Sequence, residues 1–168
     1  GTLTAMSASS IMDIDVSDLN NDGLMDIVST NGGTNLPVSI FINTTTSSSV
    51  SFNAGLNLSG GSYVSSVRIA DMNKDGKNDI IVGYQSDRID VFQNNFTSGS
   101  ITASSFGSAQ TISGATGGNW VWNIDAGDID GDGMPDISLG DFNAGSAVDL
   151  IKNNTTAGGT ISAANFAI

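Results

Sequence analysis

A nine-residue motif rich in aspartate occurs three times along the chain. It reads DLNNDGLMD from Asp18, DMNKDGKND from Asp71 and DIDGDGMPD from Asp128, so each copy follows the pattern D-x-[DN]-x-D-G-x-x-D. The copies begin 53 and 57 residues apart. A motif that returns at such a regular spacing predicts a repeat architecture, in which each repeat forms one structural unit.

Within each copy, oxygen-bearing side chains alternate along a tight turn, which predicts a site for a hard cation. Oxygens at positions 1, 3 and 5 converge, and the glycine at position 6 allows the turn that brings in the carbonyl of position 7. A carboxylate at position 9 closes the shell, and this number of oxygen ligands favours calcium over magnesium. We predict three Ca2+ sites, with the ligands Asp18, Asn20, Asp22, Leu24 and Asp26; Asp71, Asn73, Asp75, Lys77 and Asp79; and Asp128, Asp130, Asp132, Met134 and Asp136.

Two other interpretations of the motif are weaker. Asp, Asn and Gly also form hairpin turns without a metal, but three copies with three, three and four carboxylates would repel strongly if no cation bound. An EF-hand needs a bidentate glutamate at loop position 12, where this chain has Ser29, Val82 and Leu139. The loops also run into the β-favouring segments DIVST, DIIVGY and DISLGD, so we expect them to join two strands.

The segments between the loops return in the same order in each repeat. An apolar run precedes the loop, a short strand follows it, then comes PVSIFIN, RIDVFQN or AVDLIKN, and last a Ser/Thr/Gly stretch that ends at Phe52, Phe106 or Phe166. Four strands per repeat are the unit of a β-propeller blade. We predict an all-β single domain, 1–168, of three four-stranded propeller-type blades, with repeats of about 1–52, 53–105 and 106–168.

The loops and the strand order resemble the FG-GAP or VCBS-type calcium-binding repeats of integrin-alpha-like β-propellers. The resemblance covers essentially the whole chain, and the loop motif is its specific part. It implies an extracellular or cell-surface location, calcium that makes the fold rigid, and a role in cell adhesion or binding more often than in catalysis.

Three blades are too few for a closed propeller, which has four to eight. The final NFAI and the initial GTLTAMSASSIMDIDVSD are in phase as pieces of one interval between repeats. The chain can therefore meet a second copy as a six-bladed ring, continue head-to-tail as a filament, or be cut from a longer polypeptide with further blades. We expect self-association or a larger parent protein, because exposed edge strands promote aggregation.

Composition excludes several classes of function. A net charge of -12 argues against nucleic-acid binding, and the chain has no His or Cys for imidazole or thiol chemistry. No apolar run is long enough to span a bilayer, and the first residues have neither an initiator Met nor a signal-peptide pattern, which indicates a processed product or an excised segment. Seven aspartates lie outside the loops without spacing that suggests a catalytic pair: Asp13, Asp15, Asp87, Asp90, Asp125, Asp141 and Asp149.

The sequence therefore predicts a structural or adhesive protein and no enzyme, assembling with copies of itself into a filament or ring. The alternative is a non-catalytic binding module from a larger propeller or a polysaccharide-active enzyme. A cell-surface protein or glycan is a further expected partner. N-x-[ST] sequences mark candidate glycosylation sites, which would make the chain a glycoprotein: Asn43, Asn57, Asn95, Asn153 and Asn154.

Three further expectations concern Arg68, the two tryptophans and the relative calcium affinity of the loops. Arg68 is expected to pair with Asp15 or Asp125 across a blade boundary. Trp120 and Trp122 are expected to face opposite ways, with packing between sheets as their more ordinary role and a sugar or protein ligand as the alternative for one of them. By charge count, the third loop should bind calcium most tightly and the second, next to two lysines, most weakly.

Overall fold

The structure is a computed structural model that describes residues 10–32, 38–114, 116–118, 120–142 and 148–168. Within these ranges the chain is all-β, apart from two 3-10 turns, η1 (Ala103–Ser105) and η2 (Ala163–Asn165). It forms three four-stranded antiparallel sheets, each built from four strands that follow one another along the chain. The predicted fold of three four-stranded blades is confirmed.

The three sheets have the same strand order. The first sheet contains β1 (Ile11–Ser17), β2 (Asp26–Asn31), β3 (Val38–Phe41) and β4 (Leu56–Leu58). The second contains β5 (Val64–Ala70), β6 (Asp79–Tyr84), β7 (Arg88–Phe92) and β8 (Gln110–Ser113). The third contains β9 (Trp120–Gly127), β10 (Asp136–Phe142), β11 (Val148–Asn153) and β12 (Phe166–Ala167).

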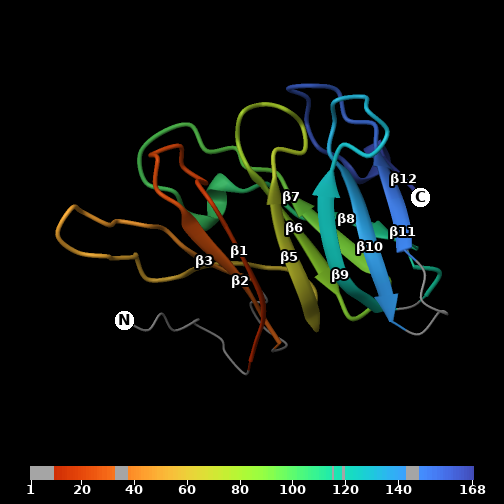
Figure 1. Ribbon diagram of the computed structural model, residues 1–168, viewed down its shortest axis with the longest axis horizontal. Helices are drawn as coiled ribbons and strands as arrows, with labels where there is room; N and C mark the ends of the chain where they lie inside the picture. The colour runs from red at the N-terminus through yellow and green to blue at the C-terminus, as the bar shows by residue number, and fades with distance from the viewer. Residues whose placement is uncertain (1–9, 33–37, 115, 119, 143–147) are drawn as a thin grey trace.

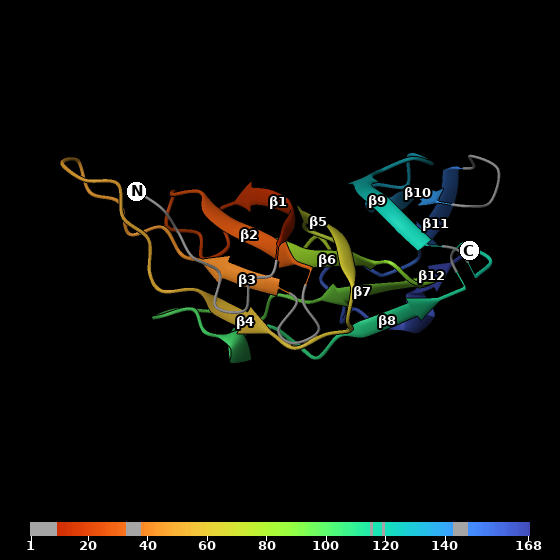
Figure 2. The same cartoon turned by 90° about the horizontal axis from the view of Figure 1, so that it is seen from below.

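The sheets stand side by side as blades of an arc, and the arc does not close (Figures 1 and 2). The first strands β1, β5 and β9 lie next to one another along one side of the arc (Figure 1). The loops that carry the repeated motif all leave the same end of these strands. The aspartate-rich motif therefore recurs at one rim of the arc, once per sheet.

The fourth strand of each sheet starts at or after the phenylalanine that ends the Ser/Thr/Gly stretch. Phe52 and Phe106 form isolated bridges with Asn43 and Asn94, and β4 and β8 follow them. Each of the first two sheets thus includes residues beyond 52 and 105, where the sequence pattern places the repeat ends. In each sheet the phenylalanine pairs with an asparagine that lies at the end of the third strand or two residues beyond it.

Two apolar clusters fill the spaces between neighbouring sheets. The first cluster joins sheets one and two through fully buried side chains such as Ile40 and Val67. The second joins sheets two and three in the same way, through residues such as Val91 and Leu139. Middle-sheet strand β6 is buried along its whole length, so both faces of that sheet are covered.

Each first strand contains a β-bulge at the same repeat position. The register shifts skip Met12 in β1, Ser65 in β5 and Trp122 in β9, all six residues before the first aspartate of the loop. A bulge adds one unpaired residue and turns its side chain to a new direction. Three bulged residues therefore come together where β1, β5 and β9 lie side by side.

Candidate metal-binding loops

Each loop joins the first two strands of its sheet, as the sequence predicts. Its ninth residue is the first residue of the second strand: Asp26 begins β2, Asp79 begins β6 and Asp136 begins β10. The glycine at position 6 has φ of 87°, 84° and 93° in the three loops. These positive angles strain most other residues, which explains why glycine occupies this position in every copy.

The loops have one hydrogen-bond pattern in three copies. The carboxylate at position 1 accepts the N–H of the glycine at position 6, at 2.8 Å for Asp18, 2.9 Å for Asp71 and 3.0 Å for Asp128. The carboxylate at position 5 accepts the N–H of position 7, at 2.8, 3.0 and 2.9 Å. These bonds turn the acidic side chains of positions 1 and 5 toward the inside of the loop.

The aspartate at position 9 fastens the loop to the rest of its sheet. Asp26, Asp79 and Asp136 are buried, and each accepts one N–H from loop position 2 and one from an asparagine at the end of the third strand or two residues beyond it. Burial raises the pKa of Asp79 to about 7 and also raises the pKa of Asp26. A bound cation would favour the charged form of both carboxyl groups.

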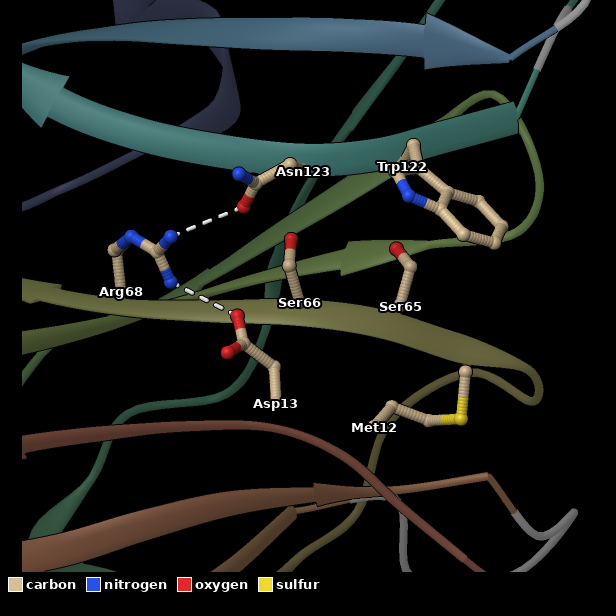
Figure 3. Close-up of a pocket in the computed structure, with 7 residues that line it drawn as sticks. All are labelled: Met12, Asp13, Ser65, Ser66, Arg68, Trp122 and Asn123. Atoms are coloured by element: carbon tan, nitrogen blue, oxygen red, sulfur yellow. Dashed lines mark hydrogen bonds and ion pairs between the residues drawn. The ribbon is translucent and has the colours of Figure 1, made fainter.

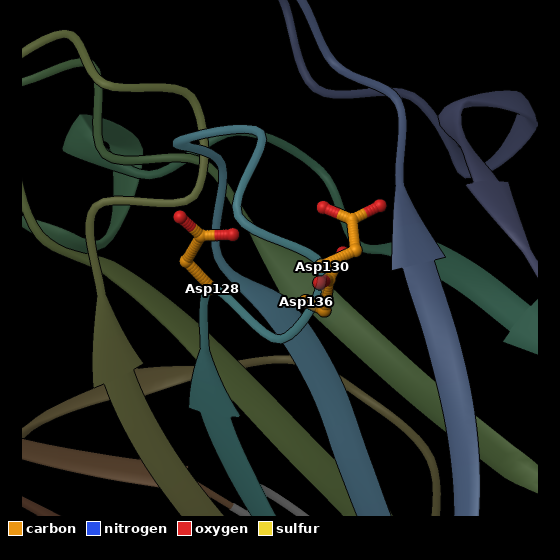
Figure 4. Close-up of side chains that lie close together, drawn as sticks. All are labelled: Asp128, Asp130 and Asp136. Atoms are coloured by element: carbon orange, nitrogen blue, oxygen red, sulfur yellow. The ribbon is translucent and has the colours of Figure 1, made fainter.

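The third loop brings carboxylates close enough to hold a metal ion. Ligand oxygens of Asp128, Asp130 and Asp136 all lie within 4.8 Å of one another (Figure 4). The first two loops have an asparagine in place of Asp130, so they offer one carboxylate fewer but the same number of oxygen-bearing side chains. An all-oxygen set around one point fits a hard divalent cation such as calcium.

A lysine that the sequence reasoning missed lies at the third loop. The Lys152 ammonium contacts Asp130 and is 3.0 Å from the Asp132 carboxylate. The Met134 N–H and this ammonium hold the pKa of Asp132 below its usual value. This ammonium compensates part of the negative charge of the third loop, so it lowers the charge advantage that the residue count gave to this loop.

The second loop has the lysine contact that the sequence suggests. The Lys77 ammonium lies 3.0 Å from the Asp75 carboxylate. One lysine therefore contacts carboxylates in each of the second and third loops, with one ion pair in the second and two in the third, and the order of calcium affinity stays a prediction.

An asparagine at the end of each third strand links the loops across blade boundaries. The Asn94 amide donates to the carbonyl of Leu19 in the preceding loop at 2.8 Å, and the Asn153 amide donates to that of Met72 at 2.7 Å. Each also donates to position 8 of its own loop. The sequence signal was the recurrent asparagine in IFIN, VFQN and LIKN, but its partners are distant in sequence.

The expected ion pair of Arg68 is confirmed with Asp125 but not with Asp15. Arg68 lies 3.8 Å from Asp125, but its shorter contact is with Asp13, at 2.8 Å. Asp15 instead accepts the N–H of Ile69, so the expected Arg68–Asp15 pair is wrong. Asp13 and Asp15 both face β5, and Asp13 also accepts the N–H of Val67, the residue next to Arg68.

The two tryptophans share one face, so the expectation that they face opposite ways is wrong. Trp120 and Trp122 both stack on Phe142, with ring centroids 6.0 and 5.1 Å apart. Residues two apart on a strand point to the same side. Both side chains are about half exposed, so neither packs as filler between two sheets.

The candidate glycosylation sites differ in accessibility. Asn95 and Asn154 are exposed, whereas Asn43 and Asn57 are half-buried. Asn153 is fully buried and its amide nitrogen donates to two carbonyls, which does not fit a glycosylation acceptor in the folded chain.

Comparison with known proteins supports the interpretation of the repeats. The FG-GAP-like repeat family matches residues 18–82 and 71–139, which together cover more than half of the chain. No curated protein matches the sequence. Within the described ranges, no helix has the length and hydropathy that a membrane crossing needs. FG-GAP-like repeats are a binding-module type without catalytic activity, typically extracellular and often calcium-binding, and the chain belongs to the FG-GAP-like repeat family.

Proposed function

We propose that the chain is a calcium-stabilised, extracellular structural module that joins end to end with copies of itself. The observation that carries this proposal is a match between the two outer faces of the arc. Each outer face exposes apolar side chains at repeat positions that are buried at the two internal interfaces. The first and last sheets therefore present the two halves of one further interface.

The outer face of the first sheet is one of these halves. Ile14 of β1 is 58% exposed, while its repeat equivalents Val67 and Ile124 are 0% and 2% exposed. Ile11 follows the same pattern beside Val64 and Val121. In the second and third sheets, these positions pack against the preceding sheet.

The outer face of the third sheet is the other half. Leu150 of β11 is 51% exposed, while its equivalents Ile40 and Val91 are both 0% exposed. Val148 and Ile129 extend the same exposed surface, although the equivalents of both are buried in the first two sheets. Burial of these apolar side chains would favour a third contact with the geometry of the two internal interfaces.

The hydrogen bond of the recurrent asparagine would also form between two copies. Asn94 and Asn153 each bind a carbonyl of the preceding loop, so the Asn43 amide of one copy would donate to the Ile129 carbonyl of another. Joining the third sheet of one chain to the first sheet of the next is a heterologous contact. It gives a closed ring if the rotation closes and a filament if it does not.

Calcium would act on folding and on assembly together. The loops bear ten carboxylates, and their mutual repulsion opposes the folded state unless cations bind. The proposed ligands are the side chains of loop positions 1, 3, 5 and 9 and the carbonyl of position 7. Since the Asn94 amide donates to a loop carbonyl, ordering the loops would also order the blade boundaries.

The acidic, cysteine-free composition and the family's usual location support an extracellular or cell-surface setting. Adhesion would then be a property of the assembled structure. Glycans at the exposed Asn95 and Asn154 would suit such a surface, and mass spectrometry of the native protein tests this point.

The test is the mass and shape of the particles in calcium, by light scattering with negative-stain electron microscopy, before and after chelation. We expect rings or filaments in calcium that dissociate in chelator. Leu150→Asp should abolish assembly, whereas Ser113→Asp, at an exposed residue on β8 of the middle sheet, should not. A folded wild-type monomer at all concentrations in calcium would refute self-assembly and favour the alternative, in which further blades of a longer polypeptide cover the end faces.

A further inference from the structure

A cavity of about 260 Å³ lies where the three first strands meet, away from the calcium loops (Figure 3). The three bulged residues, Met12, Ser65 and Trp122, contribute to its wall. All three sheets therefore build it, and neither end face is needed to form it.

Two buried hydroxyl groups face this cavity without a partner. The bulge in β5 lets the adjacent residues Ser65 and Ser66 both line it, and in Figure 3 both hydroxyls point toward β9. Ser65 is 7% exposed and Ser66 is 1% exposed, and neither Oγ has a hydrogen-bond partner among the described residues. An unpaired buried hydroxyl costs free energy, which a ligand with its own hydroxyls would recover.

The charges at the cavity cancel one another. Arg68 donates to Asp13 at 2.8 Å and to the Asn123 side-chain oxygen at 3.0 Å, so it connects β5 to both neighbouring first strands. Among the lining residues, the charge of the Arg68 guanidinium is matched by the Asp13 carboxylate, and Asp125 lies 3.8 Å from the same guanidinium, so no uncompensated positive charge attracts an anion. The connection also holds the polar groups in fixed positions, which lowers the entropy lost on binding.

Trp122 adds an apolar surface beside these polar groups. It is 51% exposed, and its ring stacks on Phe142, which fixes its orientation. An aromatic face next to hydroxyl, amide and carboxylate groups complements a ligand that has one C–H face and a rim of hydroxyls.

We propose that this cavity binds one ring of a neutral carbohydrate. The sugar's C–H face would lie on Trp122, and its hydroxyls would pair with Ser65, Ser66 and the Asp13–Arg68 pair. The volume is just below the range of about 300–1,000 Å³ that accommodates drug-sized ligands, so it suits a single ring. The cavity is formed within one chain, so this binding is separate from assembly and should persist in the Leu150→Asp variant.

The test uses the whole chain in calcium and a panel of free monosaccharides as probes: glucose, galactose, mannose, fucose and N-acetylglucosamine at millimolar concentration, with glucuronate as a charged probe. Saturation-transfer NMR detects which probe binds, and titration gives its affinity. We expect at least one neutral sugar to bind and glucuronate not to bind.

Variants then locate the site. Trp122→Ala should weaken binding by about tenfold. Trp120→Ala is the matched control, because Trp120 lies on the same strand and also stacks on Phe142 but does not line the cavity. Ser66→Ala should weaken binding several-fold without lowering the melting temperature, because it removes a hydroxyl that has no partner in the free protein.

Three results would overturn the proposal. The first is that no neutral sugar of the panel binds, or that glucuronate alone does. The second is that Trp120→Ala weakens binding as much as Trp122→Ala does. The third is that Ser66→Ala lowers the melting temperature and leaves affinity unchanged, which would give the hydroxyl a purely structural role.

Discussion

The internal interfaces and the outer faces of the arc use the same repeat positions, yet they differ in what covers them. Ile124 packs between the second and third sheets, whereas Ile14, the same residue type at the same repeat position, lies on the open face of the first sheet. Under the proposed assembly, each repeat would make an apolar contact on both sides, and the outer positions would be buried only when a neighbour is present.

Calcium removal should change the stability of the internal interfaces most, because the loops that it would loosen hydrogen-bond across them. Binding to the folded state alone stabilises by about 2.7 kcal/mol per site when free calcium is a hundredfold above Kd. We therefore expect a large fall in the melting temperature in chelator, measured by calorimetry after exhaustive dialysis. Asp128→Ala should reduce the stabilisation by calcium, and an unchanged melting curve in chelator would contradict the assignment of the loops.

Asp130→Asn is the matched control for Asp128→Ala. It gives the third loop the asparagine that the first two loops have at position 3. We expect this variant to retain most of its stabilisation by calcium, because the amide oxygen is also a ligand. Loss equal to that of Asp128→Ala would show that the loops depend on charge more than on oxygen number.

The matched isoleucines test the comparison directly. Ile124→Ala removes fully buried methyl groups, so it should lower the free energy of unfolding by about 2–5 kcal/mol. Ile14→Ala changes an exposed side chain and should cost less than about 1 kcal/mol in dilute, unassembled protein. Urea unfolding of both variants measures the difference, and equal costs would show that the face of β1 is already covered within a single chain.

The recurrent asparagines allow the same comparison between an internal interface and the edge of the arc, here for a hydrogen bond. Asn94→Ala leaves the carbonyls of Leu19 and Asn78 without this donor in a buried position, which should cost about 1–3 kcal/mol. Asn43→Ala removes a bond to Met25 at the edge of the arc and should cost less in the single chain. If Asn43→Ala is the more destabilising variant in urea unfolding, the cross-blade bond does not stabilise the interface.

A pH dependence that Asp79 adds in chelator tests the fold of the second loop without calcium. The ordinary pKa of an aspartate is 3.8, and in the fold the pKa of Asp79 is about 7. Between these pH values the folded chain therefore holds a proton that the unfolded chain has lost. Its contribution to the free energy of unfolding therefore falls as pH rises from about 4 to about 7, and it is level above that. Asp79→Asn has no such proton.

The stability of the wild type relative to Asp79→Asn should accordingly fall across this pH range, as measured by urea unfolding in chelator. Calcium should weaken the trend, because it competes with the proton for the carboxylate. A difference that rises with pH would mean that the Asp79 carboxylate is stabilised in its charged form even without calcium.

The loops and the strand order were predictable because local residues determine them. Positive φ at Gly23 and the hydrogen bonds of Asp18 arise within nine residues, so the motif alone specifies the turn. The bulge at Ser65 was not predictable, because it depends on how β5 pairs with β6. The Lys152 contact with the third loop and the Asn153 hydrogen bond to Met72 could not be predicted either, because both join residues that are distant in the sequence.

The most direct measurement for the central claim is a mixing experiment with two end-face variants. Ile14→Asp blocks the outer face of the first sheet, and Leu150→Asp blocks that of the third. Each variant alone in calcium should sediment as a monomer of 17.1 kDa. An equimolar mixture should form dimers and nothing larger, because each variant retains the face that the other lacks. A mixture that stays monomeric, or single variants that still assemble, would contradict the end-to-end contact.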